Sequence, residues 1–549
     1  MKNQKENSVM TKEQESELSQ LSPFELKNRL IAQATDSLRS FSRTMLNAGR
    51  GNPNWIATTP REAFFTLGQF AMGECKRTSH LPEGFAGLPQ RDGIASRFEE
   101  FLKQHSSQPG CELLKEAYNY MLLEHAAEPD ELVHEWAEGV IGDQYPVPDR
   151  ILKYTEHVVV DYLNHELCNN HPPKGNLQLF ATEGGTAAMC YIFDSLMQNY
   201  LLEPGDSIAL LVPAFTPYIE IPELERYNFD VLHIPASKMT EEGLHLWQYE
   251  KEAIDALRDP KYKALFVINP SNPPSYGLSS ETIEQLKDIV SSHNPHLMIV
   301  TDDVYATYVK NFRSLLADLP YNTLCVYSFS KYFGATGWRA AVIALYDNNV
   351  YDELLKYLPQ NKKSSLTRRY GSLTMQPERL KFIDRMVADS RQVALNHTAG
   401  LSLPQQTQMS LFALFSLLDK ENKYRRQMLN IIEKRLKTLW ESAGFTLIPD
   451  PLRAGYYSEI DMLVWAKKFY GQAFVDYLQS TYNPLDIVFR LARETSSVVL
   501  NGGGFDAPEW SVRVSLANLN EGDYAHIGKC LRQILTEYAE AWKATKVLV

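Results

Sequence analysis

The chain has 549 residues and a formal net charge of −12 at pH 7, which is long for a single hydrophobic core and argues against a nucleic-acid-binding surface. With 44% hydrophobic and 22% charged residues, its composition is that of a soluble globular protein with roughly two large folding units. No apolar run approaches the length of a transmembrane helix, and the first 20 residues lack the apolar core of a signal peptide, so we expect no membrane insertion.

The first part of the chain is predicted to be helical. Residues 1–20 are polar and charged, and we expect a mobile tail there. Residues 21–55 begin with apolar positions at helical spacing and end in a turn-rich loop, NAGRGNP. Residues 61–140 contain several helical patterns, of which FEEFLKQ and CELLKEAYNYMLLEH are the clearest.

The hydrophobic period changes after residue 176. Short apolar runs then alternate with helical segments, which is typical of a mainly parallel sheet covered on both faces. We therefore predict an α/β fold with a large seven-stranded sheet, whose strands lie at 177–182, 207–213, 229–236, 264–270, 297–303, 323–329 and 339–345.

The rest of the chain is predicted to build a second, smaller α/β domain. The hydrophobic pattern predicts helices up to about residue 395 and then a loop. One long helix is predicted to follow from about Met409 into the 440s. Short strands and helices alternate in the last hundred residues, and the early segment near Arg50 is expected to complete this domain. The expected division is a tail at 1–20, a segment at 21–55 joining the small domain, a large domain at 56–420 with helical insertions at about 61–140 and 346–395, and a small domain at 421–549.

The six cysteines are scattered through the sequence, with no C-x-x-C pair and no metal-ligand spacing. Several lie in apolar surroundings, which favours packed free thiols over disulfides. Such cysteines indicate a reducing compartment, so we expect a cytoplasmic protein without a bound metal.

Lys331 follows the sixth predicted strand, in SFSKY. In an open α/β sheet, ligands bind outside the carboxyl ends of the strands. A lysine that is partly desolvated there becomes nucleophilic and suits a Schiff base with an aldehyde. Taken alone, the motif is equally compatible with a solvated loop lysine.

Other polar motifs also follow predicted strands. The Gly184-Gly185-Thr186 turn precedes a helix and has the form of a phosphate cradle, although a simple glycine turn explains it as well. Asp302 can pair with a protonated ring nitrogen and Tyr305 can offer its hydroxyl to a second ring substituent. The alternative for Asp302 is a cap on the following turn.

Three further residues have both a functional and a structural interpretation. The Asn272 amide can meet a ligand oxygen or merely belong to a strand-terminating turn. Phe215 can cover a flat ligand or pack in the core. Arg513, within a late strand, can bind a carboxylate in bidentate fashion or form an internal ion pair.

Together these motifs resemble the fold type I, pyridoxal-phosphate-dependent aspartate aminotransferase family. The shared elements are G-G-T, P-x-aromatic, N-P-x-N-P, D-x-x-Y, S-x-S-K, G-W-R and a late R-x-S, in the order of that family. They lie on successive strand ends between residues 140 and 515. The resemblance therefore extends over most of the chain.

The resemblance implies roles for the individual residues. Lys331 would form the Schiff base with pyridoxal phosphate and act as a catalytic residue with Asp302, which keeps the ring nitrogen protonated, and Tyr305. Tyr305 and Asn272 would contact the ring hydroxyl oxygen. The other cofactor-binding residues would be Gly184, Gly185, Thr186, Phe215, Ser328, Ser330, Arg339 and, from a neighbouring subunit, Tyr145.

Substrate binding would fall to a smaller set of residues. Arg513 would bind the α-carboxylate, with Asn272 and Gly51 beside it. Arg50 and Arg391 are the arginines expected near the distal carboxylate, and structural ion pairs are the alternative for both.

The chain is longer than a plain aminotransferase and has NPPSYG in place of the usual N-P-T-G. The segments NAGRGNPNW, GDQYPVPDR, SFSKYFGATGWRAA and LNGGGFDAP resemble the long, aspartate β-decarboxylase branch of the family. That branch implies β-decarboxylation of L-aspartate to L-alanine and CO2, with aspartate aminotransferase activity as a second reaction. An aminotransferase without significant decarboxylation is the alternative.

A ligand-sensing transcription regulator is disfavoured, because the first 60 residues do not resemble a basic winged-helix module. The resemblance further implies small-molecule substrates, L-aspartate and 2-oxo acids. It also implies a homodimer with shared active sites, assembled into a larger homo-oligomer such as a dodecamer.

Overall fold

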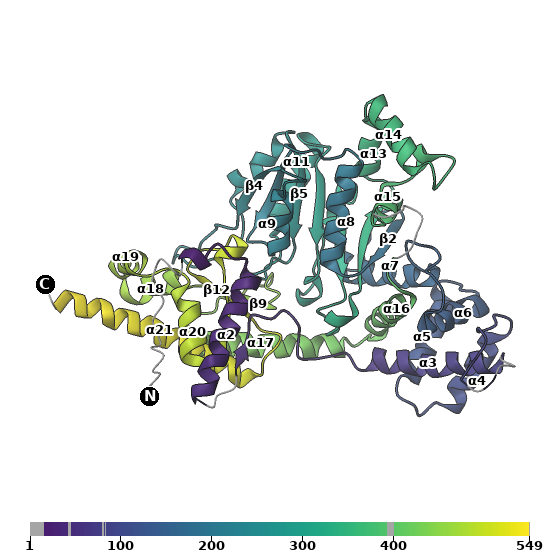
Figure 1. Ribbon diagram of the computed structural model, residues 1–549, viewed down its shortest axis with the longest axis horizontal. Coiled ribbons are helices and arrows are strands. Elements are labelled where there is room, and N and C mark those ends of the chain that lie inside the picture. The colour runs from purple at the N-terminus through teal and green to yellow at the C-terminus, as the bar shows by residue number, and fades with distance from the viewer. Residues whose placement is uncertain (1–15, 42–44, 79–81, 83, 392–399, 548–549) are drawn as a thin grey trace, which may run out of the picture.

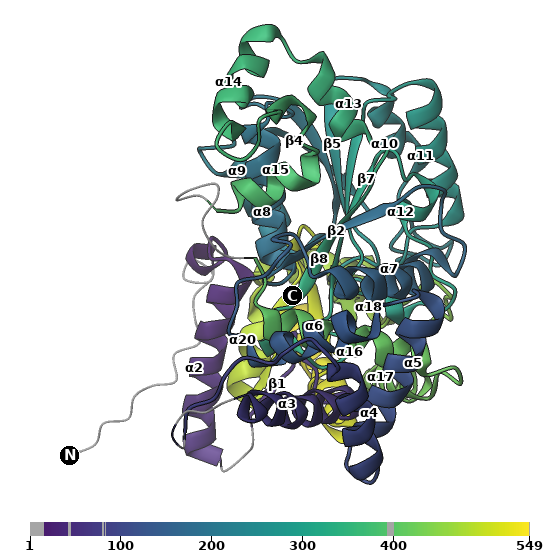
Figure 2. The same cartoon turned by 90° about the vertical axis from the view of Figure 1, so that its right-hand side faces the viewer.

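The structure is a computed structural model that describes residues 16–41, 45–78, 82, 84–391 and 400–547. Most of the expected tail at 1–20 lies outside these residues. Figure 1 shows a large sheet with helices packed on it, a compact group of strands and helices that includes the carboxyl terminus, and a helical layer on the opposite side. Figure 2 shows the same sheet nearly edge-on, with helices on both of its faces.

The predicted large sheet is confirmed. Its strands lie in the order β2-β8-β7-β6-β5-β3-β4. Strand β8 runs antiparallel to both neighbours, and the other pairs are parallel. The bounds are β2 Leu177–Thr182, β3 Ser207–Val212, β4 Asp230–Pro235, β5 Tyr262–Ile268, β6 Met298–Asp302, β7 Thr323–Ser328 and β8 Ala341–Tyr346.

The apolar runs form strands because both of their faces are buried. In β5, Phe266 belongs to the core cluster under α8, whereas Leu265 and Val267 belong to the cluster under α11. Such two-sided burial leaves no polar face on the central strands. Helix α7 Lys153–Cys168 precedes the first strand of the sheet, and the helices between its strands are α8 Gly185–Gln198, α9 Thr216–Glu223, α10 Lys251–Asp255, α11 Ser280–Ser292 and α12 Leu315–Asp318.

The ends of the parallel strands position the site. Ile268 at the end of β5 is in register with Asp302 at the end of β6, and β7 ends nearby at Ser328. The side chains that follow these strands therefore meet at one edge of the sheet. This edge faces the smaller group of strands.

The predicted helices of residues 61–140 are confirmed: four helices before the sheet, α3 to α6, form a layer together with α16. Their buried faces contribute to one hydrophobic cluster, including Phe70, Phe98 and Trp136. The bounds are α3 Thr59–Arg77, α4 Ile94–Gln104, α5 Cys111–Glu124, α6 Pro129–Ile141 and α16 Leu403–Leu418.

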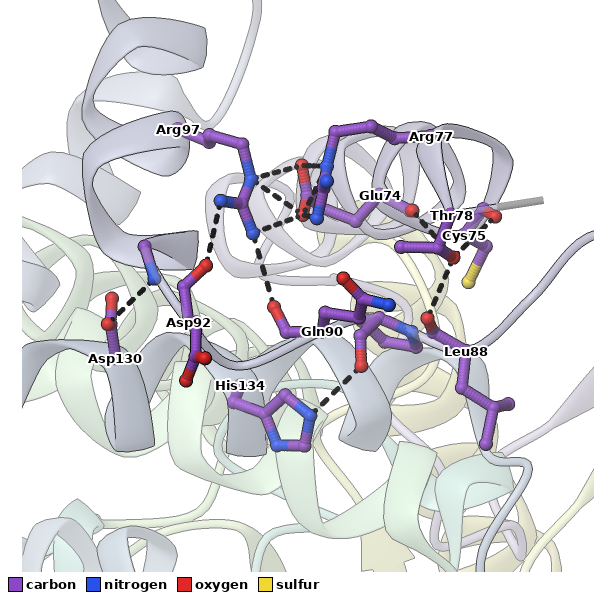
Figure 3. A network of polar contacts seen from close by, with 12 residues as sticks. Glu74, Cys75, Arg77, Thr78, Leu88, Gln90, Asp92, Arg97, Asp130 and His134 are labelled. Carbon is purple, nitrogen blue, oxygen red and sulfur yellow. Dashed lines mark hydrogen bonds and ion pairs between the residues drawn. The ribbon is translucent and has the colours of Figure 1, made fainter.

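The buried carboxylate of Glu74 links helices α3 and α4 through hydrogen bonds (Figure 3). Glu74 on α3 is only 5% exposed and accepts hydrogen bonds from Arg97 Nε on α4 at 2.9 Å and from Arg77 Nη2 at 3.1 Å. Arg97 also donates to the carbonyl oxygens of Gln90 and Asp92, at 3.1 and 3.0 Å. Because a buried charge is costly unless it is paired, this network fixes α3 against α4 and the loop before it.

The prediction of one long helix from Met409 is wrong. Helix α16 already begins at Leu403, and a break separates α16 from α17 Lys423–Ala443. A proline in the first turn of α16 is tolerated because its missing N–H would be unpaired there. At the break, the Asp419 carboxylate accepts hydrogen bonds from the N–H groups of Lys423 and Tyr424, both at 2.9 Å, and so caps the new helix.

The segment after the sheet forms α13 Val350–Tyr357, α14 Gln360–Tyr370 and α15 Phe382–Asp389, in agreement with the helical prediction for 346–395 as far as the structure describes it. Residues 392–399 lie outside the described part. None of the helices within the described ranges has the length and apolar character needed to cross a membrane.

The carboxyl-terminal elements pack with the beginning of the chain. Strand β1 Leu46–Asn47 pairs in parallel with β10 Ser497–Val498. Strand β12 pairs antiparallel with β9 and β11, which places Arg513 opposite Glu459. The other elements of this group are α2 Pro23–Phe41, β9 Tyr457–Asp461, β11 Leu500–Asn501, β12 Ser511–Ser515, α18 Met462–Tyr470, α19 Gln472–Thr481, α20 Asp486–Thr495 and α21 Glu521–Val547.

A substitution at Gly110 tests how closely the backbone before α5 packs against α3. Gly110 has a φ of +84°, and a Cβ atom there would lie 2.2 Å from the backbone nitrogen of Ala63 in α3. We expect Gly110→Ala to lower the free energy of unfolding by about 2 kcal/mol, because the backbone is strained and two helices must separate. A urea titration followed by far-UV circular dichroism measures the change.

Gly73→Ala is the matched control. Gly73 lies exposed on α3 with nothing within 4 Å of its Cβ position. Alanine there should stabilise the helix by up to about 1 kcal/mol. Equal stability of the two variants would contradict this account of Gly110.

Candidate active site

A cavity of about 290 Å³ lies at the carboxyl edge of the large sheet. Residues from the large sheet, the amino-terminal segment and the carboxyl-terminal group all line it. The sequence-predicted residues among them are Gly51, Gly185, Thr186, Phe215, Asn272, Asp302, Tyr305, Ser328, Ser330, Lys331, Arg339 and Arg513. Folding therefore brings most of the predicted site together.

Lys331 lies in the turn that follows β7. Its Nζ donates a hydrogen bond to the carbonyl oxygen of Gly51 at 3.3 Å. At the end of β7, the Ser328 hydroxyl donates to the Ser330 hydroxyl at 3.0 Å and accepts from the Ser330 N–H. The amine is thus held at the cavity by a neutral partner and can react with an aldehyde.

Asp302 forms a second, acidic end of the cavity. Its carboxylate accepts hydrogen bonds from the Tyr218 hydroxyl at 2.7 Å and from the Val304 N–H at 3.2 Å. Burial raises the pKa of Asp302, and these two hydrogen bonds and the charge of Lys331 oppose that shift. A positively charged ring nitrogen at this carboxylate would compensate for its burial.

The amino terminus of α8 forms an anion-binding end. Gly184 has a φ of +101°, and a Cβ atom there would lie 2.3 Å from Nη2 of Arg339. Only glycine therefore lets the guanidinium group pack against the start of the helix. Arg339 Nη1 also donates to the carbonyl oxygen of Thr336 at 3.2 Å. Helix amino terminus and guanidinium together suit a phosphate group.

Arg513 adds a buried positive charge to the lining of the cavity. It is 2% exposed, and its Nη1 and Nη2 donate to Asn272 Oδ1 and to the Gly49 carbonyl oxygen, both at 3.2 Å. Its Nε is buried and has no hydrogen-bond partner among the described residues. Because both contacts are to neutral oxygens, a carboxylate ligand would complete the pairing of this charge.

Sequence reasoning missed two tyrosines that matter here. Tyr218 follows Phe215 by three residues and holds Asp302, and Tyr457 begins β9. The Tyr305 hydroxyl donates to the Tyr457 hydroxyl at 3.2 Å. Neither tyrosine belongs to a recognisable motif, so no local signal marked it. Other lining residues outside the predicted set are Phe24, Asn52, Met189, Pro217, Ile268, Val304 and Thr336.

The electrostatics of Tyr457 are unusual for a buried tyrosine. Burial alone would raise its pKa, but the positive charges of Lys331 and Arg513 and the hydrogen bond from Tyr305 outweigh burial and lower it. By contrast, burial raises the pKa of Tyr305 well above its ordinary value. The two hydrogen-bonded hydroxyls therefore differ in acidity.

Four predicted residues do not line the cavity. Gly184 lies directly beneath the Arg339 guanidinium. Tyr145 is 76% exposed on the loop before α7. Arg391 forms an ion pair with Asp149 at 2.9 Å, and the side chain of Arg50 is exposed. The roles expected of Tyr145, Arg391 and Arg50 remain predictions.

The chemistry of this site fits pyridoxal phosphate, the cofactor that the sequence resemblance implies. The anion-binding helix terminus, the aromatic ring of Phe215, the carboxylate of Asp302 and the amine of Lys331 match its phosphate, ring, ring nitrogen and aldehyde in turn. No group of three or more potential metal ligands occurs within the described residues.

Comparisons with known proteins agree with this arrangement. A sequence model described as "Aminotransferase class I and II" matches residues 153–529. A "Bifunctional aspartate aminotransferase and L-aspartate beta-decarboxylase" of Pseudomonas sp is 46% identical over 528 residues, covering 96% of this chain and 98% of that protein. An aspartate aminotransferase of Musicola paradisiaca is 25% identical over 233 residues, covering 39% of this chain and 55% of that protein.

Solved structures share the fold. A double mutant of Thermus thermophilus aspartate aminotransferase aligns with a TM-score of 0.55 and 16% identity over 93% of this chain and 96% of that one. An aromatic aminotransferase from Pyrococcus horikoshii aligns with a TM-score of 0.55 and 15% identity over 92% and 99%. At this identity the likeness concerns the fold alone.

The anion-binding end can be tested at Gly184. We expect Gly184→Ala to weaken binding of pyridoxal phosphate about tenfold or more, because the added methyl group displaces the Arg339 guanidinium and strains the backbone. Titration of the cofactor-free protein with pyridoxal phosphate, followed by absorbance, gives the affinity. Gly337→Ala is the control, since nothing lies within 4 Å of that Cβ position. Equal affinities of the two variants would exclude the proposed contact.

The hydrogen bond from Tyr218 predicts a pH effect. This bond lowers the pKa of Asp302, so Tyr218→Phe should raise that pKa. If activity requires the ionised carboxylate, the acidic limb of the pH-rate profile should move to higher pH. Tyr308→Phe, which removes a buried hydroxyl without a partner in the described chain, should leave the limb in place. An unshifted limb in Tyr218→Phe would disprove the coupling.

Proposed function

Because the chain belongs to the class I and II aminotransferase family, we propose that it decarboxylates L-aspartate at the β-carbon, giving L-alanine and CO2. Aspartate aminotransferase activity is the second reaction of the same site. The observation that carries this proposal is the 46% identity to the bifunctional Pseudomonas protein. That match covers nearly the whole of both chains, and so includes helical segments before residue 153 that the family model does not reach.

The family is pyridoxal-phosphate-dependent, and the cavity residues described above would hold this cofactor. Gly184, Gly185, Thr186 and Arg339 would bind its phosphate, and Asp302 would face its ring nitrogen. When bound, the cofactor supplies an electron sink that stabilises negative charge on carbons near the substrate amino group.

The protein's own residues orient the substrate and move its protons. Arg513 would bind the α-carboxylate, with Asn272 beside it, since the hydrogen bonds that its buried guanidinium makes to described residues go to neutral oxygens. Lys331 would take the proton from Cα and return it, because its amine lies at the cavity with one neutral contact. Tyr305 and Asn272 would contact the ring hydroxyl oxygen of the cofactor.

The distal carboxylate decides between the two reactions. Decarboxylation removes its negative charge, so a tight guanidinium clamp would stabilise the starting state and raise the barrier. Among the described residues, Arg339 and Arg513 are the arginines that line the cavity, and both have other ligands in this proposal. Arg50 and Arg391 remain candidates for a weak contact, and Arg391 already has the Asp149 carboxylate as partner. This arrangement favours loss of CO2.

The proposed assembly is a homodimer with shared sites, combined into a larger homo-oligomer such as a dodecamer. Tyr145 would reach the phosphate in the neighbouring subunit, which agrees with its 76% exposure. Exposed apolar side chains also occur on the helical layer, including Phe65, Phe85 and Leu123. We further propose cytoplasmic residence, which the free thiols of Cys75, Cys111, Cys168, Cys190 and Cys325 support.

The proposed function predicts catalytic conversion without an acceptor. Incubated with pyridoxal phosphate and L-aspartate alone, the protein should release alanine and CO2 in equal amounts over many turnovers. A pure aminotransferase would stop after one turnover per site unless a 2-oxo acid were added. Measuring alanine and CO2 with and without a 2-oxo acid therefore separates the alternatives.

Lys331→Ala is the control for this assay. We expect it to lose the activity and to show no covalent cofactor after borohydride treatment, since the Schiff base requires the amine at this position. The unaltered protein should retain cofactor absorbance after the same treatment. A fully active protein without bound cofactor would contradict the whole assignment.

A further inference from the structure

We propose that Tyr457 is a catalytic residue of this site and delivers the proton that the substrate's β-carbon takes up when CO2 leaves. This inference rests on the proposed function and assigns one step of it to a group that no sequence motif marked. It stands on the position of the hydroxyl, on the hydrogen bonds that it makes, and on the charges that face it.

Tyr457 lies beside Lys331 in the cavity. The tyrosine is 3% exposed and lines the cavity at the start of β9. A Cβ atom on Gly51 would lie 2.8 Å from the Tyr457 hydroxyl and 3.2 Å from Nζ of Lys331. The hydroxyl and the amine therefore approach the same α-carbon from within the cavity, and the missing side chain of Gly51 leaves room between them.

The hydrogen bonds leave the Tyr457 proton available. Its oxygen accepts the Tyr305 hydroxyl at 3.2 Å, and its own O–H has no acceptor among the described protein groups. The neighbouring hydroxyls are engaged, since Tyr218 donates to Asp302 at 2.7 Å and Tyr456 donates to the Gly51 carbonyl oxygen at 2.7 Å. Of these tyrosines, Tyr457 has the proton that can point towards a substrate.

The charges around the ring favour giving up that proton. The groups facing Tyr457 are Lys331 and Arg513, which are positive, and the phenols of Tyr305 and Tyr456. The guanidinium carbon of Arg513 lies 4.4 Å from the centroid of the ring. A phenolate formed here would interact with both cations and accept the Tyr305 hydrogen bond, so proton donation from Tyr457 is favoured over donation from Tyr305.

The step balances without an added oxidant or reductant. The bond between Cβ and the distal carboxyl carbon breaks, its electron pair stays with the substrate, and CO2 leaves. The O–H bond of Tyr457 then breaks, and its proton forms the new C–H bond at Cβ. The phenolate regains a proton from water that enters the cavity, so each turnover consumes one solvent proton.

Tyr457→Phe tests this assignment with Tyr308→Phe as its matched control. The first variant keeps the ring under Arg513 and removes only the hydroxyl, whereas the second removes a buried hydroxyl that has no partner in the described chain. We expect alanine formation to fall about 100-fold or more in Tyr457→Phe. Oxaloacetate formation with a 2-oxo acid should change far less, because transamination needs no proton at Cβ. Tyr308→Phe should resemble the unaltered protein in both reactions.

A second measurement is independent of catalysis. The full chain, before cofactor is added, is titrated with base while the absorbance of the tyrosinate ion is followed. We expect one tyrosine to ionise before the others in the unaltered protein and in Tyr308→Phe, and this early step to be missing in Tyr457→Phe.

The outcomes separate the two proposals. If the unaltered protein forms alanine and Tyr457→Phe forms it equally fast, the role of Tyr457 is overturned and the proposed function stands. If the alanine rate falls but oxaloacetate formation falls equally, Tyr457 only maintains the site, and its role as the proton donor is overturned. If the unaltered protein forms no alanine from aspartate, the proposed function fails, and the role of Tyr457 with it.

Discussion

The pairing of one buried charge holds the site together. Arg513 is almost fully buried, and its guanidinium reaches Asn272 after β5 and the backbone at Gly49, while its cation faces the rings of Tyr457 and Phe505. A buried charge must be hydrogen-bonded or it destabilises the fold. The amino-terminal segment, the large sheet and the carboxyl-terminal strands therefore have to meet at this arginine, and the cavity lies where they meet.

The remaining charges divide the cavity into ends with different chemistry. Arg339 and the start of α8 attract an anion at one end, and Asp302 offers a carboxylate to a cation at another. Lys331 and Arg513 bring positive charge to the part of the cavity around Tyr457. Because the charges are fixed on strand ends and on a helix terminus, they orient a ligand without rearranging.

Such a site supports both transamination and decarboxylation, since both begin with the same proton removal at Cα. The balance between them depends on how the distal carboxylate is held and on how quickly the β-carbon receives a proton. How the distal carboxylate is held depends on arginines whose positions only the fold defines. How quickly the β-carbon receives a proton depends on the Tyr457 hydroxyl, which has no sequence signature. A few contacts around a common site therefore decide the ratio of decarboxylation to transamination.

The sequence by itself determined the seven strands, their alternation with helices, and the motifs at the strand ends, because these features depend on short-range patterns of apolar and turn-forming residues. It did not determine the start of α16 or the break after it, since Pro404 and Asp419 act through local capping that an amphipathic pattern conceals. Only the tertiary structure decided the roles of Tyr218 and Tyr457 and the ion pair of Arg391 with Asp149. Such contacts join residues that are far apart in the sequence, from 84 positions for Tyr218 and Asp302 to 464 for Arg513 and Gly49, and their geometry exists only once the chain has folded.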